Sequence, residues 1–192
     1  MKKICFFLFL FCSVSCNSAN SEFRLQNSRP VKWGNNCITT QDCFYISSDS
    51  NLFFLTMYYL YGNENKQFID SIEIDGYGST LYSFKSEKNN SYVVLWKIEH
   101  EYSPTFKAYY LVNGNLVKIG YWGIFTPCDN CDTQDYPIEY IRIFQRDDTI
   151  EISFLKDAEF IDYSENSYNE KWTLYKAGTL AHSFNIDNPP KP

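Results

Sequence analysis

Apolar and polar residues alternate with a period of two along several stretches of this chain, and this pattern constrains the fold more than any other feature. In residues 149–154 the apolar side chains Ile150, Ile152 and Phe154 alternate with polar ones. Residues 71–75 and 92–101 alternate in the same way, and the second stretch places Lys97 and Glu99 on a solvated face. Successive side chains of a β-strand point to opposite faces, so the pattern predicts strands that are buried on one side.

Turn residues divide these stretches at short intervals. Asn113 and Gly114 separate residues 106–112 from residues 116–121, and both residue types tolerate the positive φ angles of a tight hairpin. No stretch keeps apolar residues at helical spacing for three turns. We therefore predict an all-β fold with little helix: an antiparallel meander of about ten strands, closed as a barrel or folded as a sandwich.

The first 16 residues have the three-part order of an export signal. Lys2 and Lys3 precede an apolar run at residues 4–11, and small residues then lead to Cys16. Residues 2–16 resemble the leader of a bacterial lipoprotein precursor, which implies cleavage before Cys16 and attachment of a lipid to its sulfur. Ser13 and Ser15 also suit an ordinary signal peptidase, which would release a secreted, soluble protein.

The apolar run is far shorter than the roughly 20 residues that a membrane-spanning helix needs. We therefore expect an exported protein that the lipid on Cys16 anchors in the bacterial cell envelope, on its periplasmic or outer face. The predicted organisation is a signal peptide at residues 1–15, a polar, flexible tether at 16–30, a single β-rich domain at 31–184 and a disordered, proline-rich tail at 185–192.

Four cysteines follow Cys16, and an even number in an exported chain predicts disulfides. The local pairing, Cys37 with Cys43 and Cys128 with Cys131, is favoured because both pairs lie in turn-like segments. A longer-range pairing between the two sets is the alternative. The spacing of Cys37 and Cys43 does not suit a zinc site, and aspartates around Cys128 and Cys131 disfavour a reactive thiolate. We predict no metal site and no cofactor.

Charge and composition limit the possible functions. The net charge is −6 and the few arginines form no cluster, so nucleic acid is not an expected partner. Aromatic residues make up 19% of the chain, which strand packing and a compositional bias explain without a ligand. The two histidines, His100 and His182, are not accompanied by a nucleophile motif, and no catalytic residue is predicted.

The most specialised segment is an aromatic stretch that leads into the acidic loop around Cys128 and Cys131. Exposed aromatic rings beside fixed polar groups are typical of binding sites. The candidate binding surface consists of Tyr121, Trp122, Phe125, Asp129, Asn130 and Asp132. The sequence thus favours a lipid-anchored envelope protein whose β-rich domain binds an unidentified ligand or partner, a protein or a glycan of the envelope. The alternatives are a carboxylate-dependent hydrolase of envelope polymers and a purely structural envelope lipoprotein.

Overall fold

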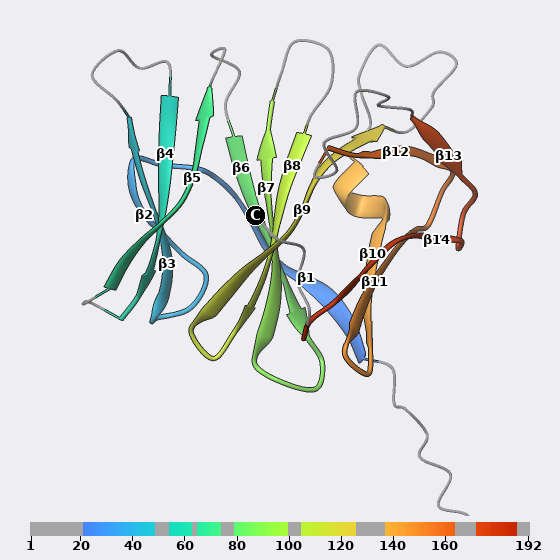
Figure 1. Cartoon of the computed structure of the whole chain (residues 1–192), viewed down its shortest axis with the longest axis horizontal. Coiled ribbons are helices and arrows are strands. Elements are labelled where there is room, and N and C mark those ends of the chain that lie inside the picture. The colour runs from blue at the N-terminus through green and yellow to red at the C-terminus, as the bar shows by residue number, and fades with distance from the viewer. Residues whose placement is uncertain are drawn as a thin grey trace, which may run out of the picture.

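A computed structural model describes residues 21–48, 54–62, 65–73, 79–99, 105–125, 137–163 and 172–187. Within these ranges the chain forms β-strands and one short 3-10 helix, η1, which confirms the predicted all-β class (Figure 1). The described part contains no helix that is both long and apolar enough to cross a bilayer. The elements are β1 (Ser21–Pro30), β2 (Gly34–Cys37), β3 (Asp42–Ser48), β4 (Phe54–Tyr61), β5 (Asn65–Glu73), β6 (Ser79–Ser86), β7 (Ser91–Ile98), β8 (Thr105–Val112), β9 (Asn115–Phe125), η1 (Pro137–Tyr140), β10 (Ile141–Arg146), β11 (Thr149–Phe154), β12 (Ala158–Asp162), β13 (Thr173–Tyr175) and β14 (Leu180–Asn185).

Ten of the strands form one antiparallel sheet that curls into a nearly closed barrel (Figure 1). Their order is β13-β12-β9-β8-β7-β6-β1-β10-β11-β14. The two edge strands, β13 and β14, are consecutive in the chain and are joined by a turn in which the Thr179 N–H donates to the Lys176 carbonyl. Asp162 of β12 and His182 of β14 also approach each other across the gap, with 3.6 Å between Oδ2 and Nδ1.

The interior of the barrel is filled with apolar side chains from strands all around the sheet. Phe84, Leu95, Tyr110, Ile143 and Ile152 are among its buried members. Fully burying a large apolar side chain stabilises the fold by about 1.5–3 kcal/mol, so this interior is a major source of stability.

A second antiparallel sheet, with the order β2-β3-β4-β5, packs on the outer face of β6–β9. The side chains between the two sheets form an apolar layer, which we call the inter-sheet layer. Its buried members are Phe44, Ile46, Met57, Tyr59, Leu81, Val94, Trp96, Ile98, Tyr109 and Leu111. Because β7 and β8 are covered on both faces, nearly every residue in them is buried.

This double coverage makes one sequence prediction wrong. Lys97, expected on a solvated face, points into the barrel with Val93 and Leu95 and is only 4% exposed. Its ammonium group is retained there by an ion pair, with 2.9 Å between Nζ and Glu99 Oε1. The alternation predicted for residues 149–154 is confirmed in β11, and Asn113 and Gly114 form the β8–β9 turn with φ angles of 49° and 77°.

The predicted tether is wrong for residues 21–30, which form strand β1. This strand lies inside the sheet, where it pairs with β6 on one side and β10 on the other, and Phe23 is buried. Most of its other side chains are polar and exposed, so the strand is held by its backbone partners and gives little apolar periodicity. The predicted tail is wrong at Asn185, which pairs with Thr149, and at Ile186, whose N–H donates to the Asp148 carbonyl. Residues 188–192 lie outside the described ranges.

The barrel has two distinct ends. The start of β1 and the β6–β7, β8–β9 and β10–β11 turns lie together at the lower end in Figure 1, which we call the hairpin end. A backbone hydrogen bond from Glu87 N–H to the Glu22 carbonyl joins the β6–β7 turn to β1, and one from Ile186 N–H to the Asp148 carbonyl joins the end of β14 to the β10–β11 turn. Strand β9 ends at Phe125 at the opposite, upper end (Figure 1).

Candidate functional site

A cleft of about 330 Å³ opens at the hairpin end, where the turns of the four-stranded sheet meet those of the barrel. One side comes from the β2–β3 turn and the end of β4, and the other from the β6–β7 and β8–β9 hairpins. The lining residues are mostly amides and hydroxyls, with one carboxylate and two tyrosines. They are Thr39, Thr40, Gln41, Asp42, Tyr61, Asn90, Tyr92, Leu111, Asn113 and Gly114.

The backbone of the β8–β9 turn places one side of this cleft. Asn113 and Gly114 both have positive φ, which a tight hairpin requires. The ring of Tyr61 lies directly on Gly114, because a Cβ atom at that position would be only 2.7 Å from Tyr61 Cε2. Gly114 is therefore required both by its own φ angle and by the close approach of the second sheet.

The β2–β3 turn holds the only carboxylate among the described residues that line the cleft. Thr39 Oγ1 donates to Asp42 Oδ2 and accepts from the Asp42 backbone N–H at 2.9 Å. The hydroxyl of Tyr59 donates to the other oxygen, Oδ1. Burial, reinforced by the hydrogen bond to Asp42, raises the pKa of Tyr59, so Tyr59 remains a proton donor. The carboxylate is thus fixed in orientation by two neutral hydroxyl groups.

A disulfide lies directly beside this turn. Cys37 of β2 and Cys43 of β3 are opposite each other in the register of the two strands, and their sulfurs are bonded. This confirms the local pairing predicted for these two cysteines. The bond closes the loop that contains the cleft residues Thr39, Thr40 and Gln41 and limits how far that loop can move. Cys128 and Cys131 lie outside the described residues.

The electrostatic character of the cleft follows from its lining. No lysine or arginine is among the described residues that line it, and Asp42 contributes one carboxylate. Such a site does not attract phosphates or carboxylates. Side-chain amides both donate and accept hydrogen bonds, as do hydroxyl groups, so the cleft is equipped for an uncharged ligand rich in hydroxyl groups.

Of the sequence-predicted binding surface the structure describes Tyr121, Trp122 and Phe125, and these three do not form one exposed site. Trp122 has no exposed surface, because it points into the barrel against Phe160 and His182. The prediction that Trp122 forms part of a binding surface is therefore wrong. Tyr121 is half-buried on the other face of β9, with its ring 5.2 Å from that of Tyr163, and Phe125 is also half-buried.

The remaining members of that predicted surface, Asp129, Asn130 and Asp132, lie outside the described residues, as does His100. The cleft residues were missed because they come from three separate turns and the end of β4. Each turn is visible in the sequence as a cluster of Asn, Gly, Thr or Gln, but only the packing of the two sheets places the turns side by side.

A second polar group lies inside the barrel toward its upper end. The strand register puts Lys97, Phe106, Trp122 and Asp162 in one row across β7, β8, β9 and β12, and His182 pairs with Asp162. The indole Nε1 of Trp122 is buried without a hydrogen-bonding partner among the described residues. Lys97 pairs with Glu99, and Trp122 and His182 pack against aromatic rings, whereas Gln41, Asn90 and Asn113 of the cleft are exposed.

Comparison with known proteins found no matching family model, no matching curated protein and no matching solved structure. The functional interpretation therefore depends on the geometry and chemistry of the cleft and on the leader sequence.

Proposed function

We propose that this chain is a lipid-anchored protein of the bacterial cell envelope whose β domain binds a glycan. The observation that carries the proposal is the cleft at the hairpin end, which combines amides, hydroxyls and tyrosines and lacks basic residues among its described lining. Ligand sites use a few fixed polar groups to orient a ligand against an apolar or aromatic surface.

Each kind of residue in this lining can contact an uncharged sugar in its own way. Gln41, Asn90 and Asn113 can donate to and accept from sugar hydroxyls. Tyr61 is 42% exposed and already lies flat on Gly114, so one of its faces is fixed while the rest remains accessible. The C–H surface of a sugar ring is apolar and suits such a face. Asp42, held by Thr39 and Tyr59, supplies an acceptor that does not need to reorganise on binding.

The anchor is supported by the leader and by the cysteine count. Cys37 and Cys43 are bonded to each other, so neither can form a disulfide with Cys16. The local pairing predicted for Cys128 and Cys131 would leave Cys16 as the single cysteine for a lipid. Cleavage before Cys16 also removes Lys2 and Lys3, which makes the exported protein more acidic than the full chain.

Binding is favoured over hydrolysis by the number of carboxylates. Glycoside hydrolysis usually needs two carboxyl groups about 5–10 Å apart across the scissile bond. The described lining of the cleft offers only Asp42, and both of its oxygens already accept hydrogen bonds.

Calorimetric titration of the mature chain with a panel of neutral oligosaccharides tests the binding proposal. We expect saturable binding to at least one of them, weakened about 3- to 10-fold by Gln41→Ala and by Asn90→Ala, the loss of one hydrogen bond each. Gln67→Ala, an exposed glutamine of β5 outside the cleft, is the matched control and should bind as the wild type does. Binding that is unaffected by both cleft variants, or absent for the whole panel, would refute the proposal.

Intact-mass analysis of the protein extracted from membranes tests the anchor. The expected mass is that of a chain beginning at Cys16 with a diacylglyceryl group attached. A mature N-terminus without lipid would show that the protein is secreted instead.

A further inference from the structure

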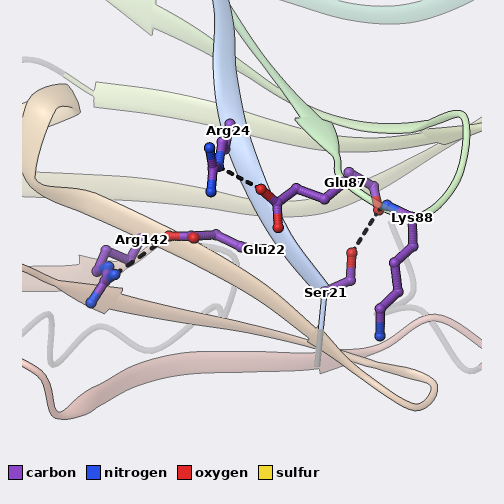
Figure 2. Close-up of polar contacts among 7 residues, drawn as sticks. Ser21, Glu22, Arg24, Glu87, Lys88 and Arg142 are labelled. Carbon is purple, nitrogen blue, oxygen red and sulfur yellow. Dashed lines mark hydrogen bonds and ion pairs between the residues drawn. The ribbon is translucent and has the colours of Figure 1, made fainter. Parts of the chain in front are cut away.

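The first residues of β1 are fixed to the hairpin end of the barrel by side chains as well as by backbone (Figure 2). Ser21 and Ser86 share a buried hydrogen bond of 2.9 Å between their Oγ atoms. Arg24 Nε lies 2.6 Å from Glu87 Oε1, and Arg142 Nη2 lies 3.5 Å from Glu22 Oε1. The position of Ser21, the first described residue, is therefore defined, and it adjoins the β6–β7 turn.

The link from this position to the proposed lipid is short. Residues 17–20 alone separate Cys16 from Ser21. A fully extended chain advances at most about 3.6 Å per residue, so Ser21 lies within about 18 Å of Cys16. Strand β7 alone, with eight residues, rises about 24 Å from the hairpin end toward the upper end. The linker is thus shorter than the height of the sheet.

The cleft lies at the same end of the molecule. Asn90 and Tyr92 line it from the β6–β7 hairpin, the same hairpin whose Ser86 and Glu87 hold the start of β1. A lipid on Cys16 would therefore keep the cleft near the bilayer and the upper end of the barrel away from it.

We propose that the hairpin end faces the membrane and that the cleft binds a neutral glycan displayed on a lipid of that same membrane. This inference rests on the proposed function, both the anchor at Cys16 and the glycan site. The arginines at this end do not favour electrostatic attraction as the cause of the orientation. Arg24 and Arg142 are each paired with a glutamate, and Arg146 is paired with Glu151 at 3.4 Å. Little unpaired arginine charge is left to attract anionic lipids.

Energy transfer in vesicles tests the orientation. The lipidated, full-length mature protein is incorporated into phosphatidylethanolamine and phosphatidylglycerol vesicles that contain an acceptor-labelled headgroup. A donor dye is attached to p-azidophenylalanine in place of Asp148, at the hairpin end, or in place of Leu174, in β13 away from it; both residues are exposed. We expect several-fold greater transfer from position 148, unchanged by added salt.

The outcomes separate the orientation from the anchor. Flotation of the protein with the vesicles reports the anchor alone, so a protein that does not float would refute both the anchor and the orientation. A protein that floats with equal transfer from the two positions, or with more transfer from position 174, would overturn the orientation and leave the anchor standing. Insertion of 30 Gly and Ser residues between Ser18 and Ala19 should leave flotation unchanged and abolish the difference in transfer. A difference that persists in this variant would show that the short linker is not its cause.

The source of the glycan is tested in the same vesicles. One arm supplies a neutral oligosaccharide recognised by the soluble domain, and the other supplies the same sugar as a glycolipid in the protein-containing membrane. Confinement of the protein and the glycolipid to one membrane surface raises the effective concentration of the sugar at the cleft. We therefore expect the glycolipid to occupy the cleft at a total sugar concentration at least tenfold lower than the free oligosaccharide needs. The spacer insertion should reduce this advantage, and Asn90→Ala should weaken binding in both arms. Equal occupancy by the free and membrane-bound sugar would overturn this part of the inference while leaving glycan binding intact.

Discussion

Asp70 of β5 forms an ion pair with Lys107 of β8, with 2.7 Å between Oδ2 and Nζ, at the junction of the two sheets. Lys107 is buried, and burial lowers its pKa even though Asp70 opposes this effect. The nearby hydroxyl of Tyr109 is also buried, and its pKa is raised by burial and by Asp70. The two sheets that form the cleft are therefore joined by a charged contact as well as by the inter-sheet layer.

Removal of the Asp70 carboxylate should destabilise the fold strongly. Asp70→Asn leaves the Lys107 ammonium buried with no partner of opposite charge, so we expect a loss of about 3 kcal/mol in the free energy of unfolding. The double variant Asp70→Asn with Lys107→Met should recover much of this loss, because it removes the unpaired charge as well. Urea unfolding of the two variants measures both effects. A loss below about 0.5 kcal/mol for Asp70→Asn would show that the pair contributes little to the junction.

Gly120 of β9 should not tolerate a side chain. A Cβ atom there would lie 2.0 Å from Nε1 of Trp122, whose indole fills the barrel interior. Displacing a buried indole forces the core to rearrange, so Gly120→Ala should lower the free energy of unfolding by about 2–3 kcal/mol. Gly34→Ala is the control: its Cβ would meet open space and only the positive φ of 83° is strained, at a cost of about 1 kcal/mol. Equal losses for the two variants would contradict the close packing of Trp122 on Gly120.

The disulfide should support the cleft as well as the fold. Replacement of both Cys37 and Cys43 by serine removes a restraint on the unfolded chain, and we expect a loss of about 2 kcal/mol, seen as a lower Tm. The β2–β3 loop should also become more mobile in the folded state. Hydrogen exchange of the Gln41 and Asp42 amides, measured below the melting transition, should be faster in the variant than in the wild type. Unchanged exchange at these two amides would show that the disulfide does not order the loop.

Two buried tyrosines predict a loss of stability at alkaline pH. Burial, with Asp42 or Asp70 nearby, raises the pKa of both Tyr59 and Tyr109 above the ordinary value of about 10. The folded state therefore holds these two protons more tightly than the unfolded state does. The stability that they contribute is fully present below pH 10 and is lost as the pH rises beyond it. Phenolate absorbance should show a late step that coincides with unfolding; ionisation of all the tyrosines in one step before unfolding would contradict this.

Because strand β1 lies between β6 and β10 in the sheet, we expect residues 21–30 to be essential for folding. A chain that begins at residue 31 lacks the strand between β6 and β10 and leaves both of their edges unpaired in the middle of the barrel. It should give a poorly dispersed NMR spectrum and no cooperative unfolding transition. A chain that begins at Ser21 is the control and should unfold with the same midpoint as the mature protein. Cooperative folding of the shorter chain would restore the original interpretation of this segment as a tether.

The strand content could be predicted from the sequence because alternation and turn chemistry are local. In β11 buried and half-buried side chains alternate as the sequence predicts. Asn113 and Gly114 form the predicted turn, in which both have positive φ. The arrangement of strands could not be predicted in the same way. Lys97 was misplaced because the second sheet covers the outer face of β7, which leaves both faces buried and removes the contrast that marks a solvated side.

The candidate site was harder to predict than the fold for a related reason. The sequence predicts Trp122 at a surface because it belongs to an aromatic stretch that leads into an acidic loop. Side chains alternate between the two faces of β9, however, and this places Trp122 in the barrel and Tyr121 outside it. The cleft depends on contacts such as that of Tyr61 with Gly114, which are far apart in the chain. Long-range packing of this kind leaves no local signature in the residues that take part in it.

Side-chain amide NMR during a titration with a neutral oligosaccharide tests the assignment of the cleft most directly. Glycan binding in the cleft predicts progressive, saturable shifts of the Gln41, Asn90 and Asn113 side-chain amide signals, with the Gln67 signal unchanged. Shifts confined to residues outside the cleft, or no shift at saturating sugar, would contradict it.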